Sequence, residues 1–423
     1  MITLIILVFI AGYTLIALEA AIFINKAAIA LITAAVCWSI LAIDSGSTES
    51  TWQSLSGHLS GIAGILFFVL GAMVIVELID AHGGFDLIIE RIRPQTKKRL
   101  VWIIGIMTFL LSAVLNNLAT AVVAITVMRK LVSNKEDRLL LCGLIVIASN
   151  AGGAWTPVGD VTTTMLWLGK QVSSGGVIIQ TFLPSVVCLI IPTMLVAAQL
   201  KGKTDPISTE KKLSITKPFE KRLILILGFL FILMVPVLQS LMDMPPWLGI
   251  LLGMGLIWVV TELLHQKKQT GDKTFLSVAA ALKRIDSPSI LFFLGILLSV
   301  AALESAGILH KTADTLNQTV HQPYIIGLGT GIFSAIIDNV PLVAAMQGMY
   351  GLDQYPTDHG FWTFLAYCAG TGGSLLIIGS ASGIAAMGME PIKFFWYFKR
   401  ISWIALIGFL AGAGIFLLQH WVS

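Results

Sequence analysis

The sequence predicts an all-α polytopic membrane protein made of two inverted repeats of five crossings each, with one re-entrant hairpin and one broken helix per repeat. Three observations lead to this fold class. Of the 423 residues, 56% are hydrophobic and only 12% are charged, whereas about 25% of the residues of soluble domains are charged. Apolar stretches long enough to cross a bilayer recur along the whole chain. Similar polar motifs also occur in the same order in both halves.

Ten stretches are predicted to cross the membrane, five in each half of the chain. They are 1–18, 21–43, 60–80, 139–168, 176–200, 222–241, 247–264, 288–304, 361–390 and 393–419. Two further apolar stretches, 100–128 and 322–350, are predicted to be hairpins that return to the side they left. We therefore expect a first repeat over 1–200, a cytoplasmic linker over 201–221 and a second repeat over 222–423 within a single integral membrane domain.

The distribution of basic residues supports the two hairpins, because Lys and Arg gather in cytoplasmic loops. If both stretches are re-entrant, 25 of the 27 basic residues fall on one side, including Lys26, and only Lys170 and Lys311 on the other. Full crossings would instead separate the basic clusters at the two ends of 100–128. An odd number of crossings per half turns the second half upside down and puts both chain termini on the periplasmic side.

Three pairs of motifs match between the halves, and the spacing between partners is nearly the same in each pair. They are "LGAMVIVELIDAHGG" (70–84) with "LGILLSVAALESAGI" (294–308), "SAVLNN" (112–117) with "SAIIDN" (334–339), and "SNAGGAWTPVGDVTT" (149–163) with "AGTGGSLLIIGSASG" (369–383). Each match is short, but their common order supports an internal repeat. Such repeats are common in secondary transporters.

The motifs predict four places with irregular backbone at membrane depth: two hairpin tips and two breaks in long crossings. Irregular backbone survives there only where it is buried or lines a cavity, and paired breaks indicate a transporter's binding site. The alternative is that the glycine pairs serve close helix packing and that Pro157 and Pro341 only kink helices. Hydrogen-bonding side chains beside the breaks favour a site. They are Ser149, Asn150, Thr156, Asp160, Thr371, Ser374 and Ser380.

The ionisable residues predicted to lie inside the crossings are carboxylates, with no basic residue beside them. They are Glu77, Asp80, Asp160, Glu304 and Asp338. Hard cations prefer oxygen ligands, whereas an anion site would carry Arg or Lys, so we predict a site for Na⁺ or Li⁺. Burial favours the protonated form of a carboxylate, which lets one carboxylate exchange a cation for a proton. Asp338 is the first candidate for this role and Asp160 the second; near the crossing ends, Glu304 and Asp80 fit a structural role equally well.

Other classes of function have less support in the sequence. No Ser–His or Cys–His pair and no HExxH motif indicates an enzyme, and the four cysteines occur singly. We expect no cofactor and no nucleic-acid partner, since the net charge of +4 is explained by loop residues; the ligands would be the transported Na⁺ or Li⁺ and H⁺. A sodium-coupled symporter of anions such as dicarboxylates and a passive channel remain alternatives.

Three long motifs, at 149–167, 334–350 and 369–390, resemble those of the NhaD-type sodium/proton antiporters of the ion transporter superfamily. The resemblance implies a bacterial inner-membrane exchanger that expels Na⁺ or Li⁺ for protons and is most active at alkaline pH. It also implies an elevator, in which a transport part slides against a scaffold that forms a homodimer. The scaffold would be 1–43 and 222–264, and the transport part 60–200 and 288–423.

The resemblance also implies which residues form the ion site. These are Asp160, Thr162 and Thr163 in the first half, and Asp338, Asn339 and Glu304 in the second. With the other polar residues at the tips and breaks, Asn116, Asn117, Asn150 and Thr156 complete the predicted site, and we expect Na⁺ to be bound by Asp160, Asp338, Asn117 and Asn339. One departure stands out: relatives carry Asp where this chain has Asn116. An Asn can bind a cation through its carbonyl oxygen but cannot release a proton, so the H⁺/Na⁺ stoichiometry is left open.

Overall fold

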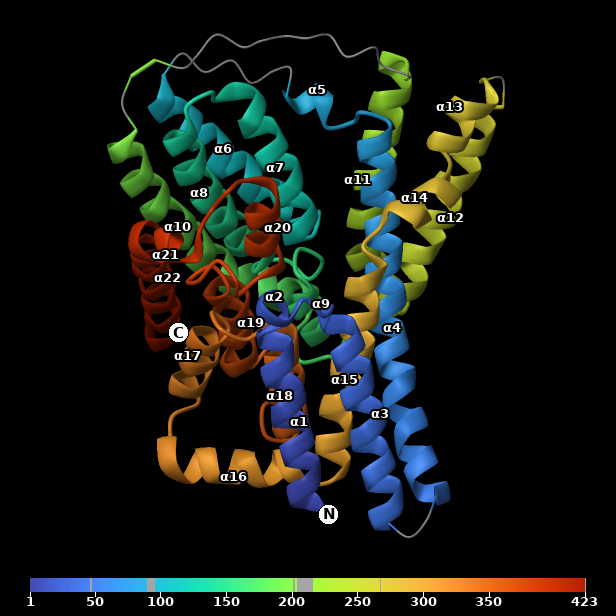
Figure 1. Ribbon diagram of the computed structural model, residues 1–423, viewed down its shortest axis with the longest axis vertical. Coiled ribbons are helices and arrows are strands. Elements are labelled where there is room, and N and C mark those ends of the chain that lie inside the picture. Colours follow the sequence, from blue (N-terminus) through green and yellow to red (C-terminus); the bar gives the residue numbers. More distant parts are fainter. Residues whose placement is uncertain (46–47, 90–95, 201, 204–215, 267, 423) are drawn as a thin grey trace.

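The computed structural model describes residues 1–45, 48–89, 96–200, 202–203, 216–266 and 268–422 (Figure 1). The regular structure of these residues is helical, apart from a single β-bridge between Thr96 and Lys203. Seven described helices are long and apolar enough to cross a membrane. The predicted all-α membrane fold is therefore confirmed. Most of the predicted linker, residues 201 and 204–215, lies outside the described residues, as does part of the basic cluster at 90–95.

In the first half of the chain, the predicted crossing at 139–168 consists of two helices, α8 and α9. Turns at 154–160 separate them, and Pro157 within these turns lacks the N–H that a continuous helix would need. The described helices are α1 (Ile2–Ala17), α2 (Glu19–Ile22), α3 (Lys26–Ser45), α4 (Thr48–Ala81), α5 (Asp86–Ile89), α6 (Lys97–Ser112), α7 (Asn117–Leu131), α8 (Lys135–Gly153), α9 (Val161–Leu168) and α10 (Ser174–Gln199).

In the second half, the predicted crossing at 361–390 is likewise divided into α19 and α20 by residues 373–380. The described helices are α11 (Pro218–Met242), α12 (Pro246–Leu264), α13 (Thr270–Phe275), α14 (Val278–Arg284), α15 (Ser287–Ser305), α16 (Ile308–Val320), α17 (Pro323–Phe333), α18 (Asn339–Met349), α19 (Gly360–Gly372), α20 (Ala381–Met389), α21 (Phe394–Arg400) and α22 (Ser402–Val422).

Each predicted hairpin stretch consists of two helices with a tip between them: α6 and α7 in the first half, α17 and α18 in the second. At each tip a polar side chain caps the second helix. Asn116 Oδ1 accepts a hydrogen bond from the Ala119 amide at 2.7 Å, and Asp338 Oδ1 accepts one from the Val340 amide at 3.3 Å. Such caps satisfy amides that lack a partner in the first helical turn. Pro341 therefore does not break the helix, because it lies in the first turn of α18, where an N–H is dispensable.

The helices form three packed groups. Helices α6, α7, α8, α10, α19, α20 and α22 share one hydrophobic core, α1 and α3 pack on α15, and α11 and α12 pack on α4. Figure 1 shows α4 extending along most of the length of the molecule, while the connection from α1 through α2 to α3 lies near the middle of the molecule. Ile16 and Ala27, on either side of this connection, share a hydrophobic cluster with Met165 of α9 and Val340 of α18. This connection thus lies beside the elements of the predicted site.

Glycines hold each broken helix against a hairpin. A Cβ on Gly152 would lie 2.2 Å from the Phe109 carbonyl oxygen, and a Cβ on Gly372 would lie 2.0 Å from that of Gly331. No side chain fits at such distances, so only glycine allows α8 to touch α6 and α19 to touch α17. The glycine pairs therefore do serve close packing, as one interpretation of the sequence proposed, and this packing also places the breaks beside the tips.

Serines make the same hydrogen bond in both halves. Ser112 Oγ donates to the Ser149 carbonyl at 2.6 Å, and Ser334 Oγ donates to the Ala369 carbonyl at 2.9 Å. The motif alignment pairs Ser112 with Ser334 and Ser149 with Ala369. The two halves thus share contacts as well as motifs, while the inverted orientation and the re-entrant placement of the hairpins in the membrane stay predictions.

Candidate functional site

Asp160 lies at the break between α8 and α9, where it takes the N-cap position of α9. Its backbone is extended, with φ −141° and ψ 150°, so the chain turns into α9 only after it. The residue is 2% exposed. A buried carboxylate at the start of a broken helix needs hydrogen-bond donors or a cation, and the surrounding helices supply the donors.

Three uncharged side chains donate hydrogen bonds to the Asp160 carboxylate. Asn117 Nδ2, at the start of α7, lies 3.3 Å from Oδ1, and Asn339 Nδ2, at the start of α18, lies 3.1 Å from Oδ2. Thr162 Oγ1, in α9, donates to Oδ2 at 2.9 Å. Both hairpin tips therefore meet at one carboxylate, although they belong to opposite halves of the chain.

The second broken helix joins this group through Asn150. Asn117 Nδ2 also donates to Asn150 Oδ1 at 3.1 Å, and Asn150 Nδ2 donates to Ser380 Oγ at 3.0 Å. Ser382 Oγ donates to Asn150 Oδ1 at 3.1 Å. We call the connected set the Asp160 cluster. Its members, all at most 5% exposed, are Asn117, Asn150, Asp160, Thr162, Asn339, Ser380 and Ser382.

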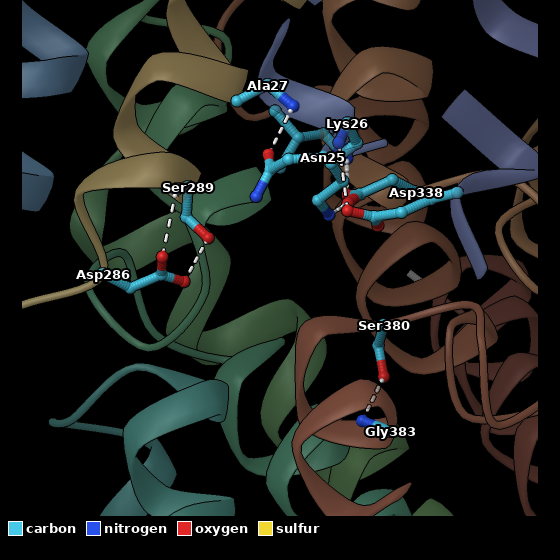
Figure 2. Close-up of polar contacts among 10 residues, drawn as sticks. Asn25, Lys26, Ala27, Asp286, Ser289, Asp338, Ser380 and Gly383 are labelled. Atoms are coloured by element: carbon cyan, nitrogen blue, oxygen red, sulfur yellow. Dashed lines mark hydrogen bonds and ion pairs between the residues drawn. The ribbon is translucent and has the colours of Figure 1, made fainter. Parts of the chain in front are cut away.

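Asp160 and Ser380 occupy equivalent positions in the two halves, because the third pair of motifs aligns one with the other. Ser380 is the N-cap of α20, with φ −145° and ψ 155°, close to the values at Asp160. Its hydroxyl accepts a hydrogen bond from the Gly383 amide at 3.3 Å (Figure 2). The same N-cap position thus carries a carboxylate in the first half and a neutral hydroxyl in the second. The Asp160 cluster therefore contains a single carboxylate.

Three predicted site residues support the backbone around the cluster instead of contacting the carboxylate. Thr163 Oγ1 donates to the Asp160 backbone carbonyl at 2.9 Å. Thr156 Oγ1 donates to the Ala113 carbonyl at 2.6 Å, which ties the first break to the first hairpin tip. Asn116 caps α7. These residues position the site, and their side chains point to other partners than the Asp160 carboxylate.

Glu304, which was predicted as a further carboxylate of the site, lies near the end of α15. Its carboxylate is beside Gly348 of α18, where an added Cβ would be 3.0 Å from Oε2. Glu77 also lies elsewhere, bound to Arg284 at 2.5 Å. The described contacts do not join either residue to the Asp160 cluster.

Asp338 is next to Asn339 in the sequence, but it faces a different partner. Its Oδ2 atom is 3.1 Å from Nζ of Lys26, the first residue of α3, as Figure 2 shows. The expectation that no basic residue accompanies the carboxylates is therefore wrong at Asp338, as it is at Glu77, which pairs with Arg284. The sequence assigned Lys26 to a loop with the other basic residues, whereas α3 packs along α15 and so brings its first turn to the hairpin tip. Asp338, the first candidate for the carboxylate shared by Na⁺ and H⁺, thus lies outside the cluster that surrounds Asp160, the second candidate.

Two contributors were not predicted as site residues, Ser382 and Lys26. The alignment of the third pair of motifs matches Thr162 with Ser382, so the repeat contained that signal. The partner of Lys26 lies 312 residues away, and no local pattern indicates it. In the described part of the chain, no three His, Cys, Asp or Glu side chains form a group that could hold a metal ion. The Asp160 cluster instead offers amide and hydroxyl oxygens around one carboxylate, and such oxygens are ligands for a hard cation.

Residues 13–370 match the family model described as "Citrate transporter" (CitMHS). The chain belongs to the citrate transporter family. The chain is 44% identical to sodium/proton antiporter 2 of Arabidopsis thaliana over 97% of both sequences. It is 45% identical to sodium/proton antiporter 1 of the same plant over 97% of this chain and 71% of the relative. It is 30% identical to the Na⁺/H⁺ antiporter NhaD of Vibrio cholerae, over 98% and 91% of the two chains.

One solved structure is similar in fold. The YdaH transporter of Alcanivorax borkumensis matches with a TM-score of 0.54 over 89% of each chain, at 12% identity. The resemblance of the motifs to NhaD-type antiporters is confirmed by the sequence relatives. This protein is therefore a multi-pass membrane transporter and not an enzyme.

Proposed function

We propose that this protein exchanges cytoplasmic Na⁺ for external protons, with Asp160 as the carboxylate that holds either ion. One observation carries the proposal: a single buried carboxylate lies among neutral amides and hydroxyls from both hairpin tips and both broken helices. Relatives named as sodium/proton antiporters, which match nearly the whole chain, support it. Li⁺, which also prefers oxygen ligands, would be a second substrate.

The amides of Asn117 and Asn339 explain how Asp160 serves both ions. Each amide now directs its nitrogen to the carboxylate, which stabilises a negative charge without a cation. If the side-chain amide of either Asn turns by half a turn, its oxygen faces Asp160 in place of its nitrogen. The rotated amides would then add two neutral oxygen ligands to Asp160 and Thr162. Protonation of Asp160 removes the charge that attracts Na⁺, so the two ions exclude each other.

We propose alternating access by an elevator movement, in which the hairpins and broken helices move together. Helices α6–α10 and α17–α22 would form the moving part, with α1, α3, α11 and α12 in the scaffold. Because α15 packs along α3 and α4 packs along α12, we place α4 and α15 with the scaffold rather than with the transport part, where the sequence had put them. A homodimer through the scaffold, a bacterial inner-membrane location and periplasmic termini belong to the same proposal.

The test is a fluorescence-dequenching assay in inside-out vesicles that contain the protein. Adding Na⁺ to acidified vesicles should release protons, Li⁺ should act similarly and K⁺ should not. Vesicles with an equal amount of Asp160→Asn should show no release. If K⁺ is as effective as Na⁺, or if the Asp160→Asn vesicles release as many protons as the unaltered protein, the exchange proposal fails.

Sodium-coupled symport of an anion is the alternative, and the description of the matching family as citrate transporters favours it. Lys26 could attract an anion, but its ammonium is already bound to Asp338, and the Asp160 cluster contains no cationic side chain. Uptake of labelled citrate or succinate into proteoliposomes, driven by a sodium gradient, would decide for symport. We expect no sodium-dependent uptake.

A further inference from the structure

We propose that the Lys26 ammonium competes with Na⁺ for Asp338 and, in the state that holds neither Na⁺ nor a proton, latches the second hairpin tip to α3. The inference rests on the proposed function, because it assigns a role within the same exchange. It names a binding group outside the Asp160 cluster and a residue that controls access of Na⁺ to it. Figure 2 shows the pair at the meeting point of α3 and the hairpin tip.

The ion pair joins two helices that lie far apart in the sequence and pack on the same neighbour. Lys26 is the first residue of α3, and Asp338 caps α18 in the second hairpin; both helices pack on α15. The Nζ–Oδ2 distance is 3.1 Å, and each side chain is only 18% exposed. If α18 moves relative to α3 in the transport cycle, this contact must break and form again once per cycle.

Other residues help to hold the Lys26 ammonium beside Asp338. The Lys26 Nζ atom lies 4.2 Å from the centre of the Phe292 ring, in a cation–π contact. Glu19 Oε1 accepts a hydrogen bond from the Lys26 amide at 3.0 Å, and Asn25 Oδ1 accepts one from the Ala27 amide at 2.9 Å. These two bonds fix the corner between α2 and α3, so the lysine is oriented before Asp338 arrives.

The position of Lys26 is unfavourable for α3 itself. The amino end of a helix carries partial positive charge, where carboxylates are stabilising and ammonium groups are not. A residue selected only to stabilise α3 would therefore be acidic or neutral here. The ammonium gains from its contacts with Asp338 and Phe292, which indicates a role in that pair.

The packing of α15 explains how Lys26 reaches the tip. A Cβ on Gly295 of α15 would lie 2.6 Å from the backbone of Ala30, so only glycine lets α3 approach this closely. Because α15 also packs against α18, the first turn of α3 lies beside the hairpin tip. Lys26 is one helical turn before Ala30 and thus reaches Asp338.

Asp338 itself supplies the Na⁺ contact. A carboxylate oxygen is a ligand for Na⁺, and the Oδ2 atom that could bind the ion is the atom that now faces the ammonium of Lys26. We therefore assign Asp338 to a first Na⁺ contact, from which the ion displaces the ammonium.

Displacement of Lys26 would transmit Na⁺ binding to the Asp160 cluster. Asn339 follows Asp338 directly and donates to Asp160. When Na⁺ takes the place of the ammonium, the tip is freed from α3 while it stays attached to Asp160. Without Na⁺ or a proton, the latch keeps the tip from moving with an empty site.

The test compares Lys26→Met with Lys26→Arg and with Lys311→Met, which removes an exposed charge on α16 away from the pair. If the ammonium competes with Na⁺, Lys26→Met lowers the KM for Na⁺. We expect a change of roughly fivefold, which corresponds to the free energy that a partly exposed ion pair contributes. Lys26→Arg and Lys311→Met should keep the KM of the unaltered protein. An unchanged KM in a folded Lys26→Met protein overturns the proposal, even where wild-type exchange is intact.

A second measurement needs no variant. In hydrogen exchange of the purified protein, NaCl compared with choline chloride should speed exchange of the amides at 24–28 by releasing α3 from the tip. Equal or slower exchange at 24–28 in NaCl contradicts the latch. Failure of the proposed function is a separate result, since it would appear as absent sodium-dependent proton release in the unaltered protein.

Discussion

The two hairpin tips have the same backbone design and differ in one charge. At the first tip Asn116 caps α7 and Asn117 donates to Asp160; at the second, Asp338 caps α18 and Asn339 donates to Asp160. The second residue of each tip thus belongs to the Asp160 cluster, and the first residue belongs to the helix cap. Only the cap of the second tip is ionisable, and, of the two described tips, only that one has an ion pair with α3.

This difference separates two tasks that a symmetrical site would combine. Asp160 holds the transported ion, and the two amides respond to its charge. Asp338 connects the occupancy of the site to the contact with α3. A neutral cap such as Asn116 can position its helix equally well, because Asn and Asp have similar N-cap preferences, but it cannot bind an ammonium group.

Removing the shared carboxylate has the largest expected effect. Asp160→Asn should abolish sodium-induced proton release, because the amide cannot take up a proton at this position. Both tips would lose the negatively charged acceptor of their amide hydrogen bonds. Residual exchange above that of empty vesicles would show that another residue carries the proton.

Making the second tip neutral has the next largest effect. Asp338→Asn keeps the cap of α18 but loses Lys26 as a partner, and we expect a loss of about tenfold in apparent Na⁺ affinity, typical of ligands near a metal site. The dequenching assay at several Na⁺ concentrations measures it. Full activity with an unchanged KM would mean that the charge at the second tip has no role in exchange.

Giving the first tip the charge of the second is the converse change. Asn116→Asp should fold normally, since Asp caps a helix as well as Asn does, and it adds a carboxylate that has no lysine partner. We expect a changed number of protons exchanged per Na⁺, measured as the effect of membrane potential on the rate in proteoliposomes. An unaltered dependence on potential would place Asn116 outside the ion path.

A control separates effects at the tips from a general loss of stability in acid. Directly after the candidate spans of α4 and α12, the buried His82 and His265 rings stack, with their Nε2 atoms 2.9 Å apart. His82 Nδ1 must donate to the Leu78 carbonyl, at 2.6 Å, so Nε2 accepts from His265 and both rings are neutral. Lys268 and Glu220 also face the pair.

Burial, as the main cause, lowers the pKa of His82 from 6.5 to about 4. Between these values the unfolded state binds a proton that the folded state does not, so stability is complete above pH 6.5 and falls towards pH 4 by about 3 kcal/mol. Thermal unfolding over this pH range should show the decline equally in all tip variants and less of it in His82→Asn. A decline confined to the Asp338 variant would contradict this assignment.

Much of the fold was predictable because its signals are local or periodic. Hydrophobic runs predicted most of the long helices, and "NN" and "DN" predicted where the two tips lie between helices. The placement of the hairpins on one side of the membrane, which the distribution of Lys and Arg indicates, stays a prediction. The aligned motifs matched Ser112 with Ser334, which make the same hydrogen bond to a backbone carbonyl in the structure. They also matched Asp160 with Ser380, which have nearly the same backbone angles.

The site was predicted less completely, because its decisive contacts are tertiary. Asn117, Thr162 and Asn339 carry motif signals, and the structure brings all three to Asp160. The roles of Asp338 and Lys26 depend on how α3 lies on α15, which Gly295 controls by close approach. The sequence around a single glycine in an apolar helix does not indicate which other helix packs against it.

Asp160 is proposed to hold either Na⁺ or a proton, and proton release on Na⁺ binding tests this directly. Purified protein in weakly buffered detergent solution is titrated with NaCl at several pH values while the pH change is recorded. We predict release of protons by the unaltered protein and by Lys311→Met, and none by Asp160→Asn. Equal release by Asp160→Asn would contradict the account.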